Sequence, residues 1–155
     1  MKLRLCVSGR LRKGPELAMF NDYLFRSEKI GKLINVSSIN VSEYDDRKWT
    51  RFLKDICLPS SFSSRSYKVL LDERGKLHSS TSFAEKIRSQ RDYGTSEFIF
   101  FIGGADGVPA SLTDNFDETV SLGKMVWPHF LVRVMLMEQI YRASTILAGL
   151  PYHKH

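Results

Sequence analysis

Hydrophobic and polar side chains alternate along this chain with two periods, one typical of strands and one typical of helices. Residues 2–8 show the two-residue period of a strand, and Pro15 is well placed in the first turn of a following helix. Residues 33–41, rich in β-branched side chains, predict a second strand, and the amphipathic helix after it is expected to end at Pro59. The first 60 residues therefore predict two strands, each followed by a helix.

The rest of the chain continues this order. Residues 67–71 predict a short third strand that ends in a turn through Gly75, and residues 79–82 supply candidate N-caps for a helix running to Gly94. The segment EFIFFI at 97–102 is apolar without alternation, which indicates a strand buried on both faces, as in a parallel sheet covered by helices. A short helix, a short strand and a long helix are predicted at 110–117, 119–123 and 128–148.

This alternation predicts a single α/β domain spanning residues 1–155, a three-layer α/β/α arrangement with a mostly parallel sheet. The 155 residues, 43% of them hydrophobic, are enough for one core without disulfides or structural metal. Cys6 and Cys57 have no zinc-site or disulfide-framework spacing, so no metal is expected.

The last predicted helix is apolar around most of its circumference, which is more than a surface helix of a monomer needs. One face is expected to pack on the sheet and another on a partner subunit. Charged residues such as Arg133 and Glu138 make it too polar for a membrane span, and the opening MKLRLCVSGR lacks the apolar core of a signal peptide. A cytoplasmic protein with no membrane segment is expected.

Charge adds a candidate partner. Lys plus Arg number 23 and Asp plus Glu number 17, and the surplus lies in residues 1–100, which hold 19 basic and 12 acidic side chains. Such a surplus favours RNA or an acidic membrane surface as partner, and Arg10, Arg12 and Lys13 follow the first strand in a loop suited to phosphate contacts. A solvated basic surface without a partner is the alternative.

Ligands of parallel α/β sheets bind at the carboxyl ends of the strands. Three segments follow predicted strands there, namely Leu71-Asp72, Gly103 to Gly107 and Leu122 to Pro128. The paired glycines allow a close backbone approach to a ligand, although a plain turn explains them as well. Neither GxGxxG nor a Walker A loop is present, which disfavours NAD and ATP.

The motifs FIGGADG at 101–107, SLGKMVWPH at 121–129, LVRVMLMEQIYRA at 131–143 and the terminal PYHKH resemble those of the RlmH family, SPOUT-class methyltransferases of large-subunit ribosomal RNA. The similarity spans the chain. It implies an S-adenosyl-L-methionine-dependent enzyme with a C-terminal trefoil knot whose loops hold the cofactor. It also implies a homodimer that methylates N3 of a pseudouridine in a stem-loop of the 23S RNA, on the assembled ribosome.

The resemblance carries over to individual residues. Those that it implies for the cofactor are Leu71, Gly103, Gly104, Leu122, Gly123, Lys124, Met125, Val126, Trp127 and Pro128. In the tail it implies His153 as the base, Lys154 as an electrostatic stabiliser or phosphate contact, and Tyr152 as a stacking or hydrogen-bonding partner of the substrate base. Lysine at 154, where some members have arginine, cannot make a bidentate contact.

Three further residues have predicted places. His129 is expected to be a structural or cofactor-loop histidine and not a catalyst. Arg133 and Arg142 point to opposite sides of the last helix, so one is expected to face a partner or RNA and the other to pair with an acid such as Glu138. Because the chain has no recognition domain, we expect one subunit to supply the cofactor pocket and the other the tail or basic loop.

Two other functions fit the same sequence. A basic α/β module could bind RNA without chemistry, and its binding would not depend on a cofactor. Another SPOUT methyltransferase could share the cofactor loops and act on a different RNA, such as transfer RNA. Only tests with substrates distinguish this second alternative from the pseudouridine methyltransferase that the resemblance implies.

Overall fold

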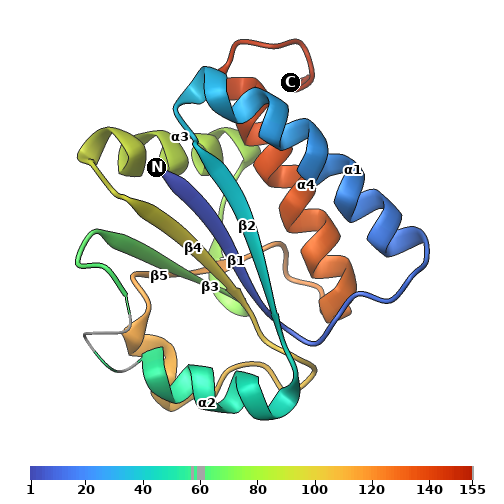
Figure 1. Ribbon diagram of the computed structural model, residues 1–155, viewed down its shortest axis with the longest axis vertical. Coiled ribbons are helices and arrows are strands. Elements are labelled where there is room, and N and C mark those ends of the chain that lie inside the picture. The colour runs from blue at the N-terminus through green and yellow to red at the C-terminus, as the bar shows by residue number, and fades with distance from the viewer. Residues whose placement is uncertain (57, 59–61, 155) are drawn as a thin grey trace.

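The computed structural model describes residues 1–56, 58 and 62–154. Within these residues five parallel strands form one sheet in the order β2-β1-β4-β3-β5 (Figure 1). The strands are β1 (Lys2–Ser8), β2 (Ser38–Tyr44), β3 (Ser66–Leu77), β4 (Glu97–Ile102) and β5 (Glu118–Ser121). The helices are α1 (Pro15–Gly31), α2 (Asp46–Ile56), α3 (Ser80–Tyr93) and α4 (His129–Leu147), with short 3-10 helices at Lys32–Ile34 and Ala110–Asn115.

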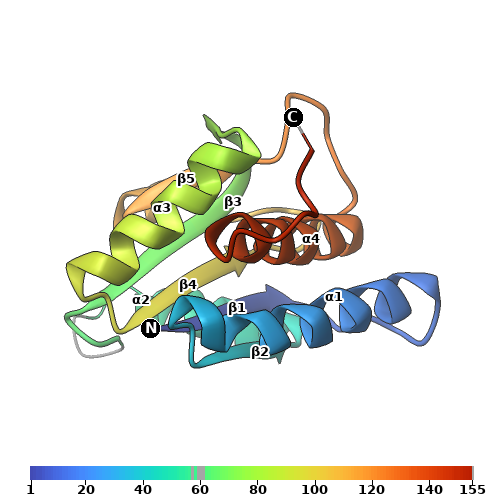
Figure 2. The same ribbon diagram turned by 90° about the horizontal axis from the view of Figure 1, so that it is seen from above.

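The sheet is covered on both faces, which confirms the three-layer α/β/α prediction. Helices α1, α3 and α4 pack on one face, and Figure 2 shows α4 between the other two. Helix α2 packs on the opposite face. The trefoil knot implied by the family resemblance stays a prediction.

Strand β4 shows why a continuous apolar run belongs at the centre of such a sheet. Phe98 and Phe100 enter the core under α1, α3 and α4, whereas Ile99 and Phe101 enter the core under α2. All four side chains are fully buried. The prediction that this strand is buried on both faces is confirmed.

The second strand was predicted too early in the chain. Strand β2 begins at Ser38, because the chain first forms a turn of 3-10 helix that ends at Asn35 in the left-handed conformation (φ 56°). The apolar side chains of Ile34 and Val36 are nevertheless buried, so they carry a hydrophobic signal without belonging to the sheet.

The third strand is longer than predicted, and the predicted turn at Gly75 is wrong. The pairing of β3 with β5 shifts register, because Leu71 and Lys76 both pair with Val120. Residues 72–75 of β3 therefore pass over the backbone of β5 between these two pairs. A Cβ added to Gly75 would lie 2.6 Å from the carbonyl carbon of Val120 and 2.7 Å from that of Thr119. Glycine is therefore required at 75 by a crossing of two backbones.

The other boundaries agree with the sequence more closely. Ser79 caps α3 by accepting a hydrogen bond from the backbone N–H of Ser82, and Gly94 ends the helix with a φ of 94°. The short helix predicted at 110–117 is a 3-10 helix. The predictions for Cys57 and Pro59, and the terminal His155, lie outside the described residues.

Candidate active site

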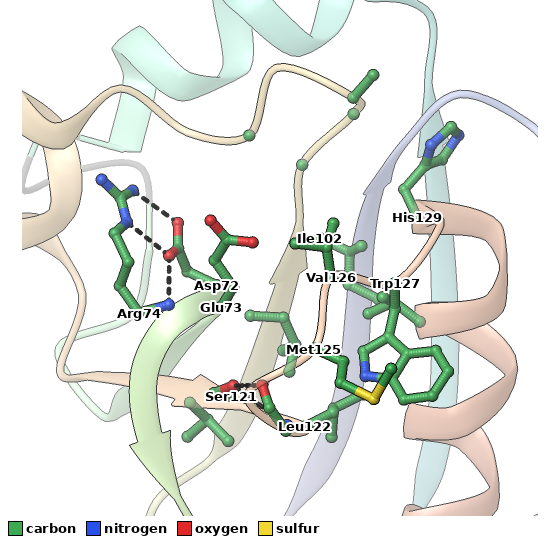
Figure 3. Close-up of a pocket in the computed structure, with 18 of the residues that line it drawn as sticks. Asp72, Glu73, Arg74, Ile102, Ser121, Leu122, Met125, Val126, Trp127 and His129 are labelled. Atoms are coloured by element: carbon green, nitrogen blue, oxygen red, sulfur yellow. Dashed lines mark hydrogen bonds and ion pairs between the residues drawn. The ribbon is translucent and has the colours of Figure 1, made fainter.

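Three segments that are distant in sequence line one cavity of about 390 Å³ at the carboxyl edge of the sheet (Figure 3). They are residues 71–74, residues 102–107 and residues 120–127, and the start of α4 adds His129 and Val132. A volume of this size suits a small-molecule ligand. The edge at which parallel sheets bind ligands therefore has a cavity in this structure.

Eight of the ten residues predicted for the cofactor line this cavity: Leu71, Gly103, Gly104, Leu122, Gly123, Met125, Val126 and Trp127. Lys124 belongs to the same loop without lining the cavity, and Pro128 precedes the first residue of α4 as its N-cap. His129, expected to be a structural or cofactor-loop histidine, also lines the cavity.

The glycine loop folds tightly on itself. The N–H of Gly107 donates to the carbonyl of Gly104 at 2.9 Å, and a Cβ on Gly103 would lie 2.9 Å from the carbonyl carbon of Gly107. The turn alone therefore accounts for glycine at 103. A Cβ on Gly104 would lie 3.2 Å from the Ser8 hydroxyl of the neighbouring strand, so this glycine keeps the loop close to β1.

The loop after β5 forms an apolar wall. Met125 and Val126 are 70% and 79% exposed, although both are hydrophobic, and Trp127 lies beside them (Figure 3). Ser121 fixes the start of this loop, because its hydroxyl donates to the carbonyl of Gly123 at 2.7 Å. An open apolar wall suits a flat aromatic ring such as adenine.

The opposite wall is acidic, and sequence reasoning assigned no role to it. Asp72 accepts hydrogen bonds from the Arg74 backbone N–H (2.9 Å) and Nε (2.8 Å), and these bonds hold the pKa of Asp72 below its usual 3.8. Glu73 and Asp106 also line the cavity. The sequence contained this signal, because the two acids Asp72 and Glu73 directly follow the apolar run at 69–71 within β3.

The C-terminal tail is attached to α4. The Tyr152 hydroxyl donates to Glu138 Oε1 at 3.1 Å, and the Tyr152 ring packs edge-on against Tyr141 with 4.6 Å between centroids. Arg142 Nε donates to Glu138 Oε1 at 3.0 Å, and Arg142 NH1 lies 3.4 Å from His153 Nδ1. We call Glu138, Arg142, Tyr152 and His153 the tail cluster.

The Tyr152 hydroxyl is a weaker acid here than a free tyrosine, so it keeps its proton. Burial, together with a hydrogen bond with Tyr23 and the charge of Glu138, raises its pKa. The guanidinium of Arg142 stacks 4.8 Å from its ring centroid. Lys154 is exposed. The tail is therefore an ordered element of the molecule up to the histidine, and not a frayed end.

The pairing of Arg142 with Glu138 confirms one sequence prediction, and the i,i+4 spacing on a helix was its signal. The other arginine differs from expectation. Arg133 does not face outward but is 2% exposed, with NH2 donating to the backbone carbonyl of Ser8.

The cavity and the tail cluster lie at different heights along α4. Val132 lines the cavity, whereas Arg142 holds the tail, and ten residues separate them along the helix. Val132 and Arg142 are therefore about 15 Å apart along the axis, and Glu138 is about 9 Å from Val132, since each residue of an α-helix adds about 1.5 Å. The residues that hold the tail thus lie further along α4 than the residue that lines the cavity.

The described part of the chain has neither a membrane-spanning helix nor a metal-binding cluster. Its helices include none that is both long and apolar enough to cross a membrane. The same residues contain no group of three or more His, Cys, Asp or Glu side chains arranged to hold a metal ion.

Comparisons with known proteins agree with this architecture. Residues 1–153 match the family model described as "Predicted SPOUT methyltransferase". The chain is 43% identical to a protein of Ruegeria sp. (strain TM1040) and 46% identical to one of Cereibacter sphaeroides (strain KD131 / KCTC 12085), each over 99% of both chains. Both relatives are named ribosomal RNA large subunit methyltransferase H.

A solved structure shares the fold without close sequence similarity. It is a probable methylase family protein from Haemophilus influenzae Rd KW20, with a TM-score of 0.53 and 10% identity, covering 99% of this chain and 70% of the other. Together with the full-length match to the family model, these findings show that the chain belongs to the SPOUT methyltransferase family.

Proposed function

We propose that this protein transfers the methyl group of S-adenosyl-L-methionine to N3 of a pseudouridine in a stem-loop of 23S ribosomal RNA, on the assembled ribosome in the cytoplasm. One observation carries the proposal. In a member of a methyltransferase family, three segments distant in sequence meet in one cavity, and eight of ten residues expected to bind the cofactor line it. The names of the full-length relatives support large-subunit RNA as the substrate.

The cavity has a chemistry that fits this cofactor. Met125, Val126 and Trp127 offer an apolar wall for the adenine ring, and the glycine loop lets the ribose and methionine portions lie close to the backbone. Glu73 and Asp106 bring negative charge, which favours a ligand that carries a sulfonium and an ammonium group. When bound, the cofactor supplies an electrophilic methyl group.

The acceptor nitrogen must lose a proton whose pKa is roughly 9 to 10 in solution. We assign this proton to His153, the stabilisation of the resulting anion to Lys154, and the orientation of the base to Tyr152. Arginine can only donate hydrogen bonds, so in the contact between Arg142 NH1 and His153 Nδ1 the imidazole nitrogen is the acceptor. That contact must break before Nδ1 can accept the substrate proton.

We further propose that the protein acts as a homodimer in which the tail of one subunit serves the cavity of the other. The separation of cavity and tail cluster along α4 supports this arrangement. So does the exposure of Met125, Val126 and Phe130 next to the cavity, since apolar side chains of this size are typical of a protein interface.

Mixed dimers test the arrangement. Gly104→Val should distort the cofactor cavity by pushing the glycine loop away from Ser8, and Tyr152→Ala should release the tail from Glu138, so each homodimer should be inactive. When the two variants assemble together in equal amounts, half of the dimers are mixed and each has one complete site, which predicts about a quarter of the wild-type activity. Activity no greater than that of the separate variants would show that the tail serves its own cavity.

The function itself is tested by transfer of a radiolabelled methyl group from S-adenosyl-L-methionine to ribosomes that lack this modification. Assembled ribosomes, isolated large subunits and naked RNA are compared, and label is expected only on the assembled ribosome. Cofactor binding without label on any of them would favour another RNA, such as transfer RNA. Absence of cofactor binding would favour a basic RNA-binding module without catalysis.

A further inference from the structure

A second cavity of about 390 Å³ lies at the same edge of the sheet as the cofactor cavity. Its floor is apolar and includes Leu17, Phe20 and Leu24 of α1. Helix α4 separates the two cavities, because Val132 lines the first and Arg133, the next residue, lines the second. Consecutive residues of a helix point about 100° apart, so one helix can form a wall of both.

Arg133 is incompletely bonded for a buried cation. Its NH2 donates to the Ser8 carbonyl, and its NH1 lies 3.6 Å from Glu43 Oε1, yet neither Nε nor NH1 has a hydrogen-bond partner among the described residues. Burial lowers its pKa, and the nearby charge of Glu43 opposes this effect. A buried guanidinium with unused donors is costly unless a further acceptor completes it.

The mouth of this cavity is basic. The Arg10 side chain is 84% exposed and lies 4.0 Å from Glu43, its nearest acid. Arg12 and Lys13 follow in the same loop, both exposed, and form no ion pair within the described part of the chain. The loop therefore attracts a chain of negative charges better than a single small anion.

We propose that this cavity receives one nucleotide of the RNA substrate that flanks the methylated one. Its base lies among the apolar side chains of α1, with a carbonyl or ring nitrogen facing Arg133 and an amino or imino group facing Glu43. Its phosphate lies against Arg10. The nucleotide is not the acceptor, because α4 stands between this cavity and the methyl donor. This inference rests on the proposed function.

Filling the mouth of the cavity tests the inference. Asn21 lines the cavity and is exposed, so Asn21→Trp should fold normally and obstruct entry. Glu28→Trp is the matched control, because Glu28 is exposed two turns further along the same face of α1 and does not line the cavity. We expect Asn21→Trp to raise KM for ribosomes about tenfold, with kcat and the Kd of S-adenosyl-L-methionine unchanged.

An unchanged KM in Asn21→Trp would overturn the inference, as would an equal rise in the Glu28→Trp control. Failure of the proposed function has a different signature, since the wild-type protein would then label no ribosomes at all. A direct binding experiment decides the inference in that case too.

That experiment follows the methyl NMR signals of Leu11, Leu17 and Leu24 while nucleoside 5′-monophosphates or inorganic phosphate are added. Shifts with the nucleotides that exceed those with phosphate are expected. Arg133→Met, which keeps the long apolar stem of the side chain, should retain the fold and lose the shifts. Equal shifts with phosphate would reduce the site to an anion site, and absence of any shift would exclude a nucleotide; either result overturns the inference.

Discussion

The crossing of β3 over β5 at Gly75 makes a quantitative prediction about stability. In Gly75→Ala, the new methyl group would lie 2.6 Å from the Val120 carbonyl carbon and 2.7 Å from the Val120 nitrogen. Both neighbours are backbone atoms of a paired strand, so no side chain can turn aside to make room. Overpacking of a core costs about 1–3 kcal/mol, and we expect about 3 kcal/mol here because two backbones must separate.

Urea denaturation followed by circular dichroism, at one protein concentration, measures this loss. With a slope of about 2 kcal/mol/M, the unfolding midpoint of Gly75→Ala should fall by about 1.5 M urea. Gly14→Ala is the control, since the nearest atom to its Cβ would be a flexible carboxylate oxygen at 3.4 Å and only a helix N-cap preference is lost. A Gly75→Ala midpoint equal to that of the control would refute the crossing.

Three other predictions address the candidate site. Gly104→Val should weaken binding of S-adenosyl-L-methionine about a hundredfold or more in calorimetry and leave dimerisation intact; unchanged affinity would remove Gly104 from the site. Glu138→Ala removes the acceptor shared by Arg142 and Tyr152, so kcat should fall about a hundredfold through a displaced tail, with cofactor affinity unchanged; a wild-type kcat would contradict this role. Because Arg74 lowers the pKa of Asp72, their pair stabilises the fold above about pH 4 and this contribution disappears as pH falls through the lowered pKa. Asp72→Asn should therefore make the free energy of unfolding less dependent on pH below about pH 4, and an unchanged slope would show that the pair contributes nothing.

Much of the fold could be predicted because burial leaves a periodic record in the sequence. A run without polar alternation identified β4, and a serine and a glycine marked the two ends of α3. The same logic failed at 33–41, where Ile34 and Val36 are buried but do not belong to a strand. Periodicity indicates which side chains are buried, but it does not indicate which type of secondary structure carries them.

The candidate site could be predicted only in part. The loops after the strands were identifiable because parallel strands place their carboxyl ends together. The acids Asp72 and Glu73 were also identifiable but were given no role, whereas the attachment of Tyr152 to Glu138 and the buried charge of Arg133 were not identifiable. These depend on contacts between residues far apart in sequence, for which one sequence holds no signal.

The sequence by itself determined the class of this protein: an α/β fold of alternating strands and helices, the edge at which a ligand is expected, and the motifs of a methyltransferase family. Only the tertiary structure decided that β3 crosses β5 at Gly75, and that the cavity and the tail lie at different heights along α4. The physical reason is the distance in sequence between the residues that make the contacts. Local patterns record the burial of each residue, whereas crossings and the meeting of distant loops are decided by how whole elements pack.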